Sequence, residues 1–252
     1  MGYADVAWGV SELRNTFYGG LQEFLSSGSF TVPDDVYKIY VTACAGGASG
    51  GCIASNDDYY VRGGNAGEFI YRKPFLVTPK TVIQITIGNG GTPVVSGALD
   101  KYLANPGGDT IIGDLITLKG GTVDLYNNNG NALAGIINCP ALTNSTGDNY
   151  DYIATLVNCG ENSSVNVGGR CGVPYINKHG LTVIPSGGGA SLGKGGNAGN
   201  IISYNGTKVP AINGEKGSGG GGAGYRYGRY DGSDWTFYKP GDGGKGYCLI
   251  EW

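Results

Sequence analysis

The residues best suited to chemistry in this chain lie in one stretch, from Tyr225 to Tyr238. Its aromatic and charged members are Tyr225, Arg226, Tyr227, Arg229, Tyr230, Asp231, Asp234, Trp235, Phe237 and Tyr238. Tyrosine and tryptophan offer broad contact area with a polar tip at low entropic cost. Arginine and aspartate add directional, charge-assisted hydrogen bonds. This mixture suits the noncovalent binding of sugars, although the alternate aromatic residues could instead fill a small core under the loop.

A second stretch of similar character covers residues 55–62. Tyr59 and Tyr60 are its candidate binding residues, and Asp57 and Asp58 precede them. A calcium site needs six or more oxygen ligands, and no calcium-loop motif surrounds these aspartates. We therefore expect a second binding loop here, and we expect no metal site.

The sequence offers little for catalysis. His179 is the only histidine, and no serine stands in a GxSxG motif. Asp231 and Asp234 could act as paired carboxylates on a glycan, but adjacent loop carboxylates are usually solvated. The glycine runs lack the GxxxxGKS or GxxxxGKT motif of phosphate-binding loops. We expect a protein that is not an enzyme and that needs no cofactor.

The cysteines do not predict a metal site either. The six positions are Cys44, Cys52, Cys139, Cys159, Cys171 and Cys248, and none forms a CxxC pair. The N-terminus has no basic start followed by an apolar stretch, so no secretion signal is predicted, and we expect mostly reduced, packed thiols. Cys44/Cys52 and Cys159/Cys171 flank short loops and could pair after release into an oxidising medium.

The composition narrows the class of protein. The chain has 252 residues, of which 50 are glycine and only 15% are charged, and its net charge is −3. A dedicated nucleic-acid binder would carry a basic face, so we expect no nucleic-acid partner. No apolar run approaches the roughly 20 residues that span a bilayer, so we expect no membrane insertion. Its 18 tyrosines and many β-branched residues argue against disorder.

Most of the apolar pattern has a period of two, as in half-buried strands. The expected strands lie within residues 29–33, 36–43, 68–77, 81–88, 109–120 and 246–252. Residues 109–120 read as two short strands bent at Gly113–Asp114. The fold class predicted is mainly β, an antiparallel β-sandwich.

Blocks of glycine interrupt those strands. They cover residues 45–51, 62–67, 88–91, 106–108, 187–199, 214–224 and 241–246. A flexible linker does not return seven times between strand-like runs, so we expect ordered structure instead. Polyglycine-II-like helices, which have three residues per turn and no internal hydrogen bonds, could pack together through their backbones. We predict such inserted helices at least within 187–224 and 241–246.

Two regions of the sequence differ from the rest of the pattern. In residues 1–28, Ala7, Val10, Leu13, Phe17, Leu21, Phe24 and Leu25 recur at three- and four-residue steps. This spacing predicts a short helical segment, which either packs on the main domain or docks another protein. We divide the chain into an N-terminal attachment segment, 1–28, and a glycine-rich β domain, 29–252. An insert at about 122–180 is rich in Asn, Ser and Thr and is too long for an ordinary loop.

Several ordered stretches of this sequence resemble the glycine-rich domain of bacteriophage tail and tail-fibre proteins. They are FTVPDDVYKIYVTACAGGASGG, GGNAGEFIYRKPFLVTPKTVIQITIGNGG, GGDTIIGDLITLKGG and GDGGKGYCLIEW. The resemblance covers roughly residues 29–121 and 181–252. The glycine blocks are also similar to those of polyglycine-II adhesins at tail-fibre tips, where glycine helices stack and the loops between them bind the host surface.

The resemblance implies a function and a location. The chain would be a receptor-binding protein of a phage tail or tail-derived particle, recognising a bacterial surface glycan or protein through its loops. Residues 1–28 would attach it to a fibre shaft or baseplate protein, as a homotrimer or as a monomeric tip. It would be made in the host cytoplasm and reside in the virion tail. The alternative is a purely structural tail or baseplate component without receptor contact.

Overall fold

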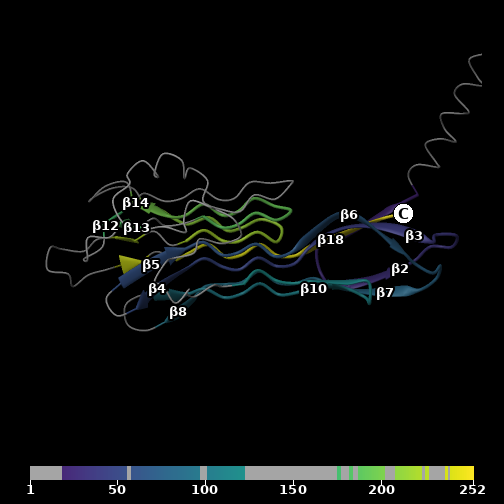
Figure 1. Ribbon diagram of the computed structural model, residues 1–252, viewed down its shortest axis with the longest axis horizontal. Helices are drawn as coiled ribbons and strands as arrows, with labels where there is room; N and C mark the ends of the chain where they lie inside the picture. The colour runs from purple at the N-terminus through teal and green to yellow at the C-terminus, as the bar shows by residue number, and fades with distance from the viewer. Residues whose placement is uncertain are drawn as a thin grey trace, which may run out of the picture.

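The computed structural model describes residues 19–55, 58–96, 101–122, 175–176, 182–183, 187–201, 208–222, 225–226, 236–237 and 239–252. In these residues the chain is mainly β and forms no helix, so none is present there that could cross a membrane. The molecule is elongated (Figure 1). Two larger sheets occupy one end, small hairpins occupy the other, and glycine-rich segments run between them.

Each of the two larger sheets is antiparallel and has four strands. The first has the order β1 (Leu21–Phe24), β18 (Tyr247–Glu251), β3 (Lys38–Cys44) and β6 (Phe69–Leu76). The second has the order β11 (Ile116–Leu118), β10 (Thr110–Ile112), β7 (Val82–Thr86) and β2 (Gly28–Thr31). The strands predicted from the period of two are therefore confirmed, including the bend at Gly113–Asp114 between β10 and β11.

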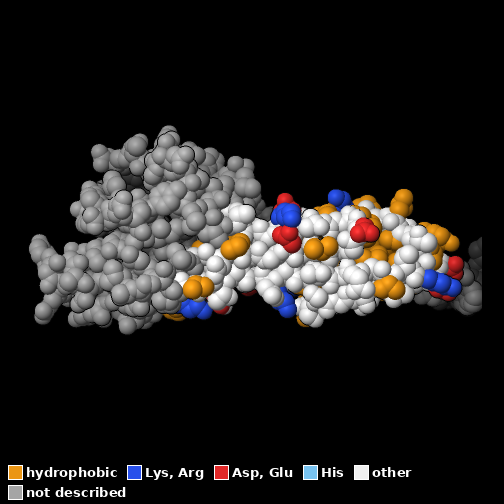
Figure 2. Space-filling model, turned by 90° about the horizontal axis from the view of Figure 1, so that it is seen from below, with side chains coloured by type: hydrophobic (Ala, Val, Ile, Leu, Met, Phe, Trp, Pro, Cys, Tyr) orange, Lys and Arg blue, Asp and Glu red, His pale blue; other side chains and the backbone are white. Residues whose placement is uncertain are grey.

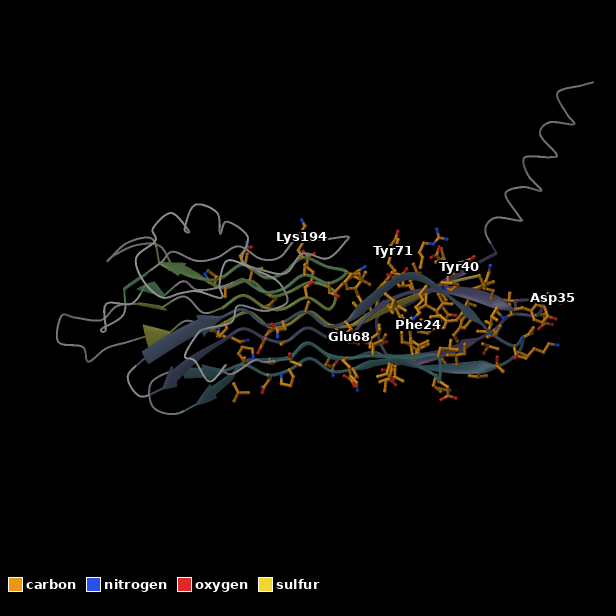
Figure 3. The ribbon with its side chains drawn as sticks, in the orientation of Figure 1. Phe24, Asp35, Tyr40, Glu68, Tyr71 and Lys194 are labelled. Atoms are coloured by element: carbon orange, nitrogen blue, oxygen red, sulfur yellow. The ribbon has the colours of Figure 1, made fainter. Side chains whose placement is uncertain are left out.

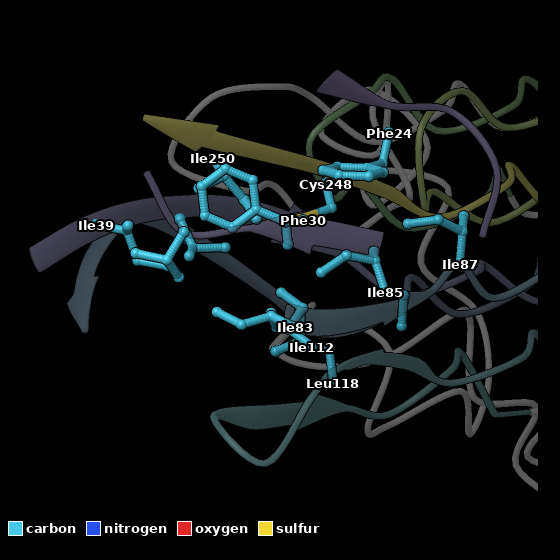
Figure 4. Close-up of a cluster of buried hydrophobic side chains, with 14 residues drawn as sticks. Phe24, Phe30, Ile39, Ile83, Ile85, Ile87, Ile112, Leu118, Cys248 and Ile250 are labelled. Carbon is cyan, nitrogen blue, oxygen red and sulfur yellow. The ribbon is translucent and has the colours of Figure 1, made fainter. Parts of the chain in front are cut away.

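One hydrophobic core lies between these two sheets (Figure 4). Alternate residues point into it, so that β3 buries Ile39, Val41 and Ala43 while its first residue, Lys38, stays exposed. The facing sheet contributes Ile85 and other buried residues of β2, β7, β10 and β11. Burying each large aliphatic side chain contributes about 1.5–3 kcal/mol. Two layers around one core agree with the expected sandwich, and we call this end of the molecule the sandwich end.

The start of the described chain corrects one expectation. Leu21–Phe24, predicted as part of a helix, is strand β1 and pairs with β18. Gly20 extends that ladder, because its N–H donates to the Trp252 carbonyl (2.8 Å) and its carbonyl accepts the Trp252 N–H (3.0 Å). A Cβ at Gly20 would meet the Trp252 indole at 2.4 Å. Pairing with the distant C-terminal strand thus overrides the local helical spacing, and residues 1–18 lie outside the described residues.

Five two-stranded hairpins complete the described strands. They are β4 (Gly51–Ser55) with β5 (Asp58–Arg62), β8 (Val94–Ser96) with β9 (Lys101–Leu103), β12 (Tyr175–Ile176) with β13 (Thr182–Val183), β14 (Asn200–Ile201) with β15 (Lys208–Val209), and β16 (Tyr225–Arg226) with β17 (Thr236–Phe237). The insert predicted at about 122–180 lies outside the described residues except for Thr122 and β12.

Candidate binding surface

Glycine-rich segments connect the sandwich end to the hairpins. Residues 45–50 lead from β3 to β4, and residues 63–68 return from β5 to β6. Residues 87–93 and 104–109 do the same for the hairpin β8–β9, and residues 239–246 lead to β18. Figure 1 shows these segments running side by side along the molecule. The hairpins are therefore carried away from the hydrophobic core, to the opposite end, which we call the hairpin end.

Main-chain hydrogen bonds hold these segments together with a period of three residues. In residues 45–50, successive N–H groups donate to three different neighbouring segments, and each third residue returns to the same neighbour. Gly46 and Ser49 donate to Gly108 and Asn105 (both 3.0 Å), Gly47 and Gly50 donate to Gly244 and Gly241 (both 2.9 Å), and Ala48 donates to Asn65 (2.9 Å). A β-strand, with its period of two, cannot bond in three directions in this way.

The close approach of these backbones requires glycine. A Cβ built on Gly47 would lie 2.1 Å from the Ser218 carbonyl oxygen. A Cβ on Gly243 would lie 1.9 Å from the Gly47 carbonyl oxygen. Both obstacles are main-chain atoms, which cannot turn aside as the end of a flexible side chain can. Side chains at these positions would therefore push apart the segments that the hydrogen bonds join.

Small polar residues fit among the glycines where their hydroxyls find partners. Ser218 is fully buried, and its hydroxyl donates to the Gly193 carbonyl (2.6 Å) and accepts the Ser191 N–H (2.8 Å). The Ser191 hydroxyl donates to the Gly67 carbonyl (3.2 Å). A buried hydroxyl without partners would be costly, so these bonds explain why serine is tolerated there.

An ionic cluster marks the junction between the sandwich end and the glycine-rich segments, where Figure 3 labels Glu68. The Glu68 carboxylate accepts the Lys119 N–H (2.9 Å), and the Lys119 ammonium donates to Asp109 (2.7 Å). Asp109 also accepts the Gly120 N–H (2.9 Å). The hydrogen bond from Lys119 is the main cause that lowers the pKa of Asp109. This cluster connects residue 68 to the residues that flank β10 and β11. It lies where the glycine-rich segments begin, and we call these segments together the glycine-rich section.

Those predicted binding residues that the structure describes lie on two hairpins. Tyr225, Arg226 and Phe237 lie on β16–β17, with Tyr225 opposite Phe237. Tyr59 and Tyr60 lie on β5, opposite Ala54 and Ile53. Outside the described residues lie Tyr227, Arg229, Tyr230, Asp231, Asp234, Trp235 and Tyr238. The two hairpins have different neighbours, since β4 lies beside β9 and β14 lies beside β16.

Sequence reasoning predicted strands for none of the five hairpins, and it treated 55–62 and 225–238 as loops. The hairpin β14–β15 had a usable signal, because Asn205–Gly206 stands in the sequence between its two strands, and Asn-Gly is a strong hairpin signal. The hairpins β8–β9 and β12–β13 are joined by residues 97–100 and 177–181, without such a dipeptide. Their strands have only three and two residues, which is too short for a clear alternation.

A family of known proteins shares this arrangement of glycine-rich sequence. Residues 25–252 match the model of a family described as a glycine-rich domain. The chain belongs to this family. The match spans both the sandwich end and the hairpin end, so the glycine-rich segments are part of the domain. A comparison with curated proteins found no match.

The types of side chain on the described surface of this glycine-rich domain differ from one region to another. Seen from below in Figure 2, hydrophobic side chains gather over the sandwich end, whereas the glycine-rich section presents mainly backbone and uncharged atoms. Within the described ranges, no group of three or more His, Cys, Asp or Glu residues could hold a metal ion. The candidate binding surface at the hairpin end thus rests on the sequence of its strands and loops.

The two described thiols lie at the sandwich end, away from the hairpins. Cys44 and Cys248 are free and buried. Burial raises the pKa of each to about 12, although a hydrogen bond with Ser191 partly offsets the effect at Cys44. Because the thiolate is the reactive form, both remain unreactive packed thiols at neutral pH. Cys44 is thus not paired with Cys52 in this structure.

Proposed function

We propose that this protein is a receptor-binding adhesin of a phage tail or of a tail-derived particle. It recognises a bacterial surface glycan or protein without covalent chemistry. The observation that carries the proposal is the separation of the two ends: β1, which belongs to the proposed attachment segment, pairs with β18 at the sandwich end, and the hairpins lie at the far end (Figure 1). An attachment segment at one end and hairpins at the other suit a protein that bridges a particle and a cell. The resemblance of residues 29–121 and 181–252 to tail proteins supports the same reading.

The glycine-rich section acts as the rigid spacer of this adhesin, as a bundle of polyglycine-II-like helices. The three-residue period of its hydrogen bonds supports that conformation, since polyproline-II geometry also repeats every three residues. A second run has the same period, in which Gly193, Gly196 and Gly199 donate to Lys216, Gly219 and Gly222. Glycine loses more conformational entropy on folding than any other residue, and these bonds offset that loss.

Residues 1–28 attach the adhesin to a fibre shaft or baseplate protein, as a homotrimer or as a monomeric tip. Leu21 and Leu25, in the described part of this segment, are 69% and 61% exposed. Large apolar side chains that are exposed in this segment are suited to contact with a protein partner. Several copies on one particle would add avidity, so that each hairpin end needs only modest affinity. The adhesin would reside in the virion tail.

The competing proposal is a structural tail or baseplate component without receptor contact. The dense hydrogen bonding of the glycine-rich section supports this structural proposal, because a stiff section could serve the assembly of a tail without contacting a receptor. The two proposals differ in what the loops do. An adhesin loses binding when its loops are changed, whereas a structural component tolerates the change.

The test is binding of the labelled, purified protein to a panel of bacteria that includes the host of the source particle. The test variant replaces Tyr227 and Tyr230 with alanine. The matched control replaces Tyr37 and Tyr71, which are 64% and 60% exposed at the sandwich end. All three proteins must have the same thermal midpoint. Selective staining that the test variant loses and the control keeps supports the adhesin, and absence of staining on every strain, including that host, contradicts it.

A further inference from the structure

One face of the first sheet, formed by β1, β18, β3 and β6, points away from the hydrophobic core, and we call it the outer face. Residues paired across antiparallel strands share a face, so Leu21, Glu251 and Tyr40 lie together on it. The core takes the alternate residues, such as Val41. The exposed large apolar residues of the outer face are Leu21, Tyr71 and Leu76, which are 69%, 60% and 82% exposed. Exposed apolar side chains gathered on one face indicate contact with a protein.

A β-bulge in β6 adds an aromatic side chain and a cation to the outer face. The pairing between β3 and β6 shifts there, so that two residues, Tyr71 and Arg72, lie opposite the single residue Thr42. Figure 3 shows Tyr71 and Tyr40 on the side of the sheet away from Phe24. Arg72 has a positive φ of 45°, which is unfavourable for a residue other than glycine, and its N–H donates to the Thr42 hydroxyl (3.1 Å). Strain that places a side chain on a surface points to a role for that surface.

Charged side chains divide the outer face into an acidic half and a basic half. The acidic half, on β1 and β18, holds Glu23 and Glu251, and the basic half, on β3 and β6, holds Lys38 and Arg72. Arg72 and Glu251 form an ion pair where the halves meet (Nε–Oε2 3.3 Å). The cations of Lys38 and Arg72 lie 5.1 and 5.6 Å from the centre of the Tyr40 ring. The face as a whole is therefore neutral, with its two signs of charge on opposite sides.

A second copy of the chain is complementary to this distribution of charge. Rotation about an axis along the strands keeps every residue at its height and brings the acidic half of one copy to the basic half of the next. Glu23 and Arg72 lie level on the two edge strands, because both are in line with Thr42 of β3. Glu23 of one copy therefore meets Arg72 of the next, and Leu21 meets Pro74 in the same way. A two-fold axis across the strands would instead place like charges together.

We propose that the outer face is a contact between copies of this chain, which assemble about an axis along the strands of the first sheet. This proposal goes beyond the adhesin function and does not depend on it. The contact covers Leu21 and Leu76 and places the Glu23–Arg72 pairs between copies. Because the axis runs along the strands, the hairpin ends of all copies point the same way. Such an assembly agrees with a homotrimer and excludes a monomeric tip.

Sedimentation equilibrium of the whole protein tests the proposal, because one copy has a mass of 25.9 kDa. We expect a larger mass for the unaltered protein, which falls on dilution and in high salt. Glu23→Lys and Arg72→Glu, each made alone, place like charges together and should weaken the association at least about tenfold. The two changes combined in one chain exchange the charges and should restore it.

The matched control is Lys80→Glu. Lys80 also has a positive φ, of 65°, and it also takes part in an exposed ion pair, with Asp34 (3.3 Å), but it lies in the turn before β7 and outside the outer face. This variant should associate as the unaltered protein does. Each variant is compared only if it unfolds in a single thermal transition, so that a loss of folding is not mistaken for a loss of association.

A mass of one copy at every concentration at which the unaltered protein is soluble overturns the proposal. Association that both single reversals leave unchanged also overturns it, because the copies are then joined elsewhere, and so does failure of the combined variant to associate. Staining of bacteria separates this claim from the adhesin function. A monomeric protein that stains its host leaves the adhesin function intact while the contact fails, and an assembled protein that stains no strain, including that host, does the reverse.

Discussion

The sandwich end and the glycine-rich section are both closely packed, but the space between their segments is filled in opposite ways. At the sandwich end, side chains such as Ile39 and Ile85 fill the space between two sheets and exclude water. In the glycine-rich section the space between segments is closed by removing side chains altogether. Carbonyl oxygens lie where a Cβ of Gly47 or Gly243 would be, and main-chain hydrogen bonds replace apolar contacts.

This difference determines how each region responds to mutation. A hydrophobic core tolerates the addition of small groups better than the hydrogen-bonded glycine segments do, because side chains can repack while main-chain atoms cannot move independently. The loss of apolar side-chain volume should be harmful only at the sandwich end. The four predictions below test that contrast, in order of decreasing expected effect.

The largest effect should come from Gly47→Ala. The new Cβ would lie 2.1 Å from the Ser218 carbonyl oxygen, so the segments must separate and lose hydrogen bonds. We expect the free energy of unfolding to fall by about 3 kcal/mol or more, measured by denaturant unfolding. The matched control is Gly28→Ala in β2, where the Cβ meets only the Phe24 ring at 3.5 Å. A change above about 1 kcal/mol in the control would contradict the argument.

A slightly smaller effect is expected from Ile85→Ala. Ile85 is 2% exposed in the core, so its truncation leaves a cavity and should cost about 2–5 kcal/mol. Its counterpart in the glycine-rich section is Ile212→Ala, because Ile212 is 52% exposed and contributes main-chain hydrogen bonds that alanine keeps. Thermal unfolding should show a clear shift for the first variant and almost none for the second. Similar shifts in both would mean that apolar contacts also hold the glycine-rich section.

The third prediction concerns the buried Ser218 hydroxyl. Ser218→Ala removes the donor to the Gly193 carbonyl and the acceptor of the Ser191 N–H, which leaves two buried polar groups without partners. We expect a loss of about 1–3 kcal/mol in the free energy of unfolding. Ser218→Cys, which keeps a weak donor and acceptor, should recover part of the loss. An unchanged free energy of unfolding in the alanine variant would show that the glycine-rich section does not need the Ser218 hydroxyl.

The smallest effect should come from the junction, through Asp109. Its folded-state pKa is lowered by Lys119, so the carboxylate adds stability above the unfolded pKa of about 4. That contribution is lost as the pH falls through the lower folded-state pKa. Asp109→Asn should therefore lower the thermal midpoint slightly at pH 7, and the difference should disappear once the pH is below the folded-state pKa. A difference that persists unchanged in acid would assign the effect to packing, and added salt should shrink the difference at pH 7.

Most strands of the sandwich end could be predicted from the sequence alone. The alternation in Lys38–Cys44 and Val82–Thr86 identifies strands because one face of each is buried and the other is not. The bend at Gly113 was predictable from Gly-Asp, and Gly113 does adopt a positive φ of 43°. Local pattern suffices in these places because the buried face and the turn are both local properties.

Other features depend on partners that are far away in the sequence. Leu21–Phe24 has helical spacing but becomes a strand, since Cys248–Glu251 offers an unpaired edge next to it. The glycine blocks indicated close packing, but not which block bonds to which. Gly47 meets residues 244 and 218, and neither the spacing nor the composition of the block identifies them. For the candidate site, composition pointed to residues 225–238, while the position of β14 beside β16 appeared only in three dimensions.

The central claim is that main-chain hydrogen bonds make the glycine-rich section an ordered spacer between the two ends. Amide hydrogen exchange of the whole protein, followed by mass spectrometry of its peptides, tests this claim most directly. The account predicts that residues 45–50 and 217–222 exchange as slowly as β3 and β18. Exchange of those glycine segments at the rate of an unfolded chain, while β3 and β18 stay protected, would contradict it and leave a flexible linker in its place.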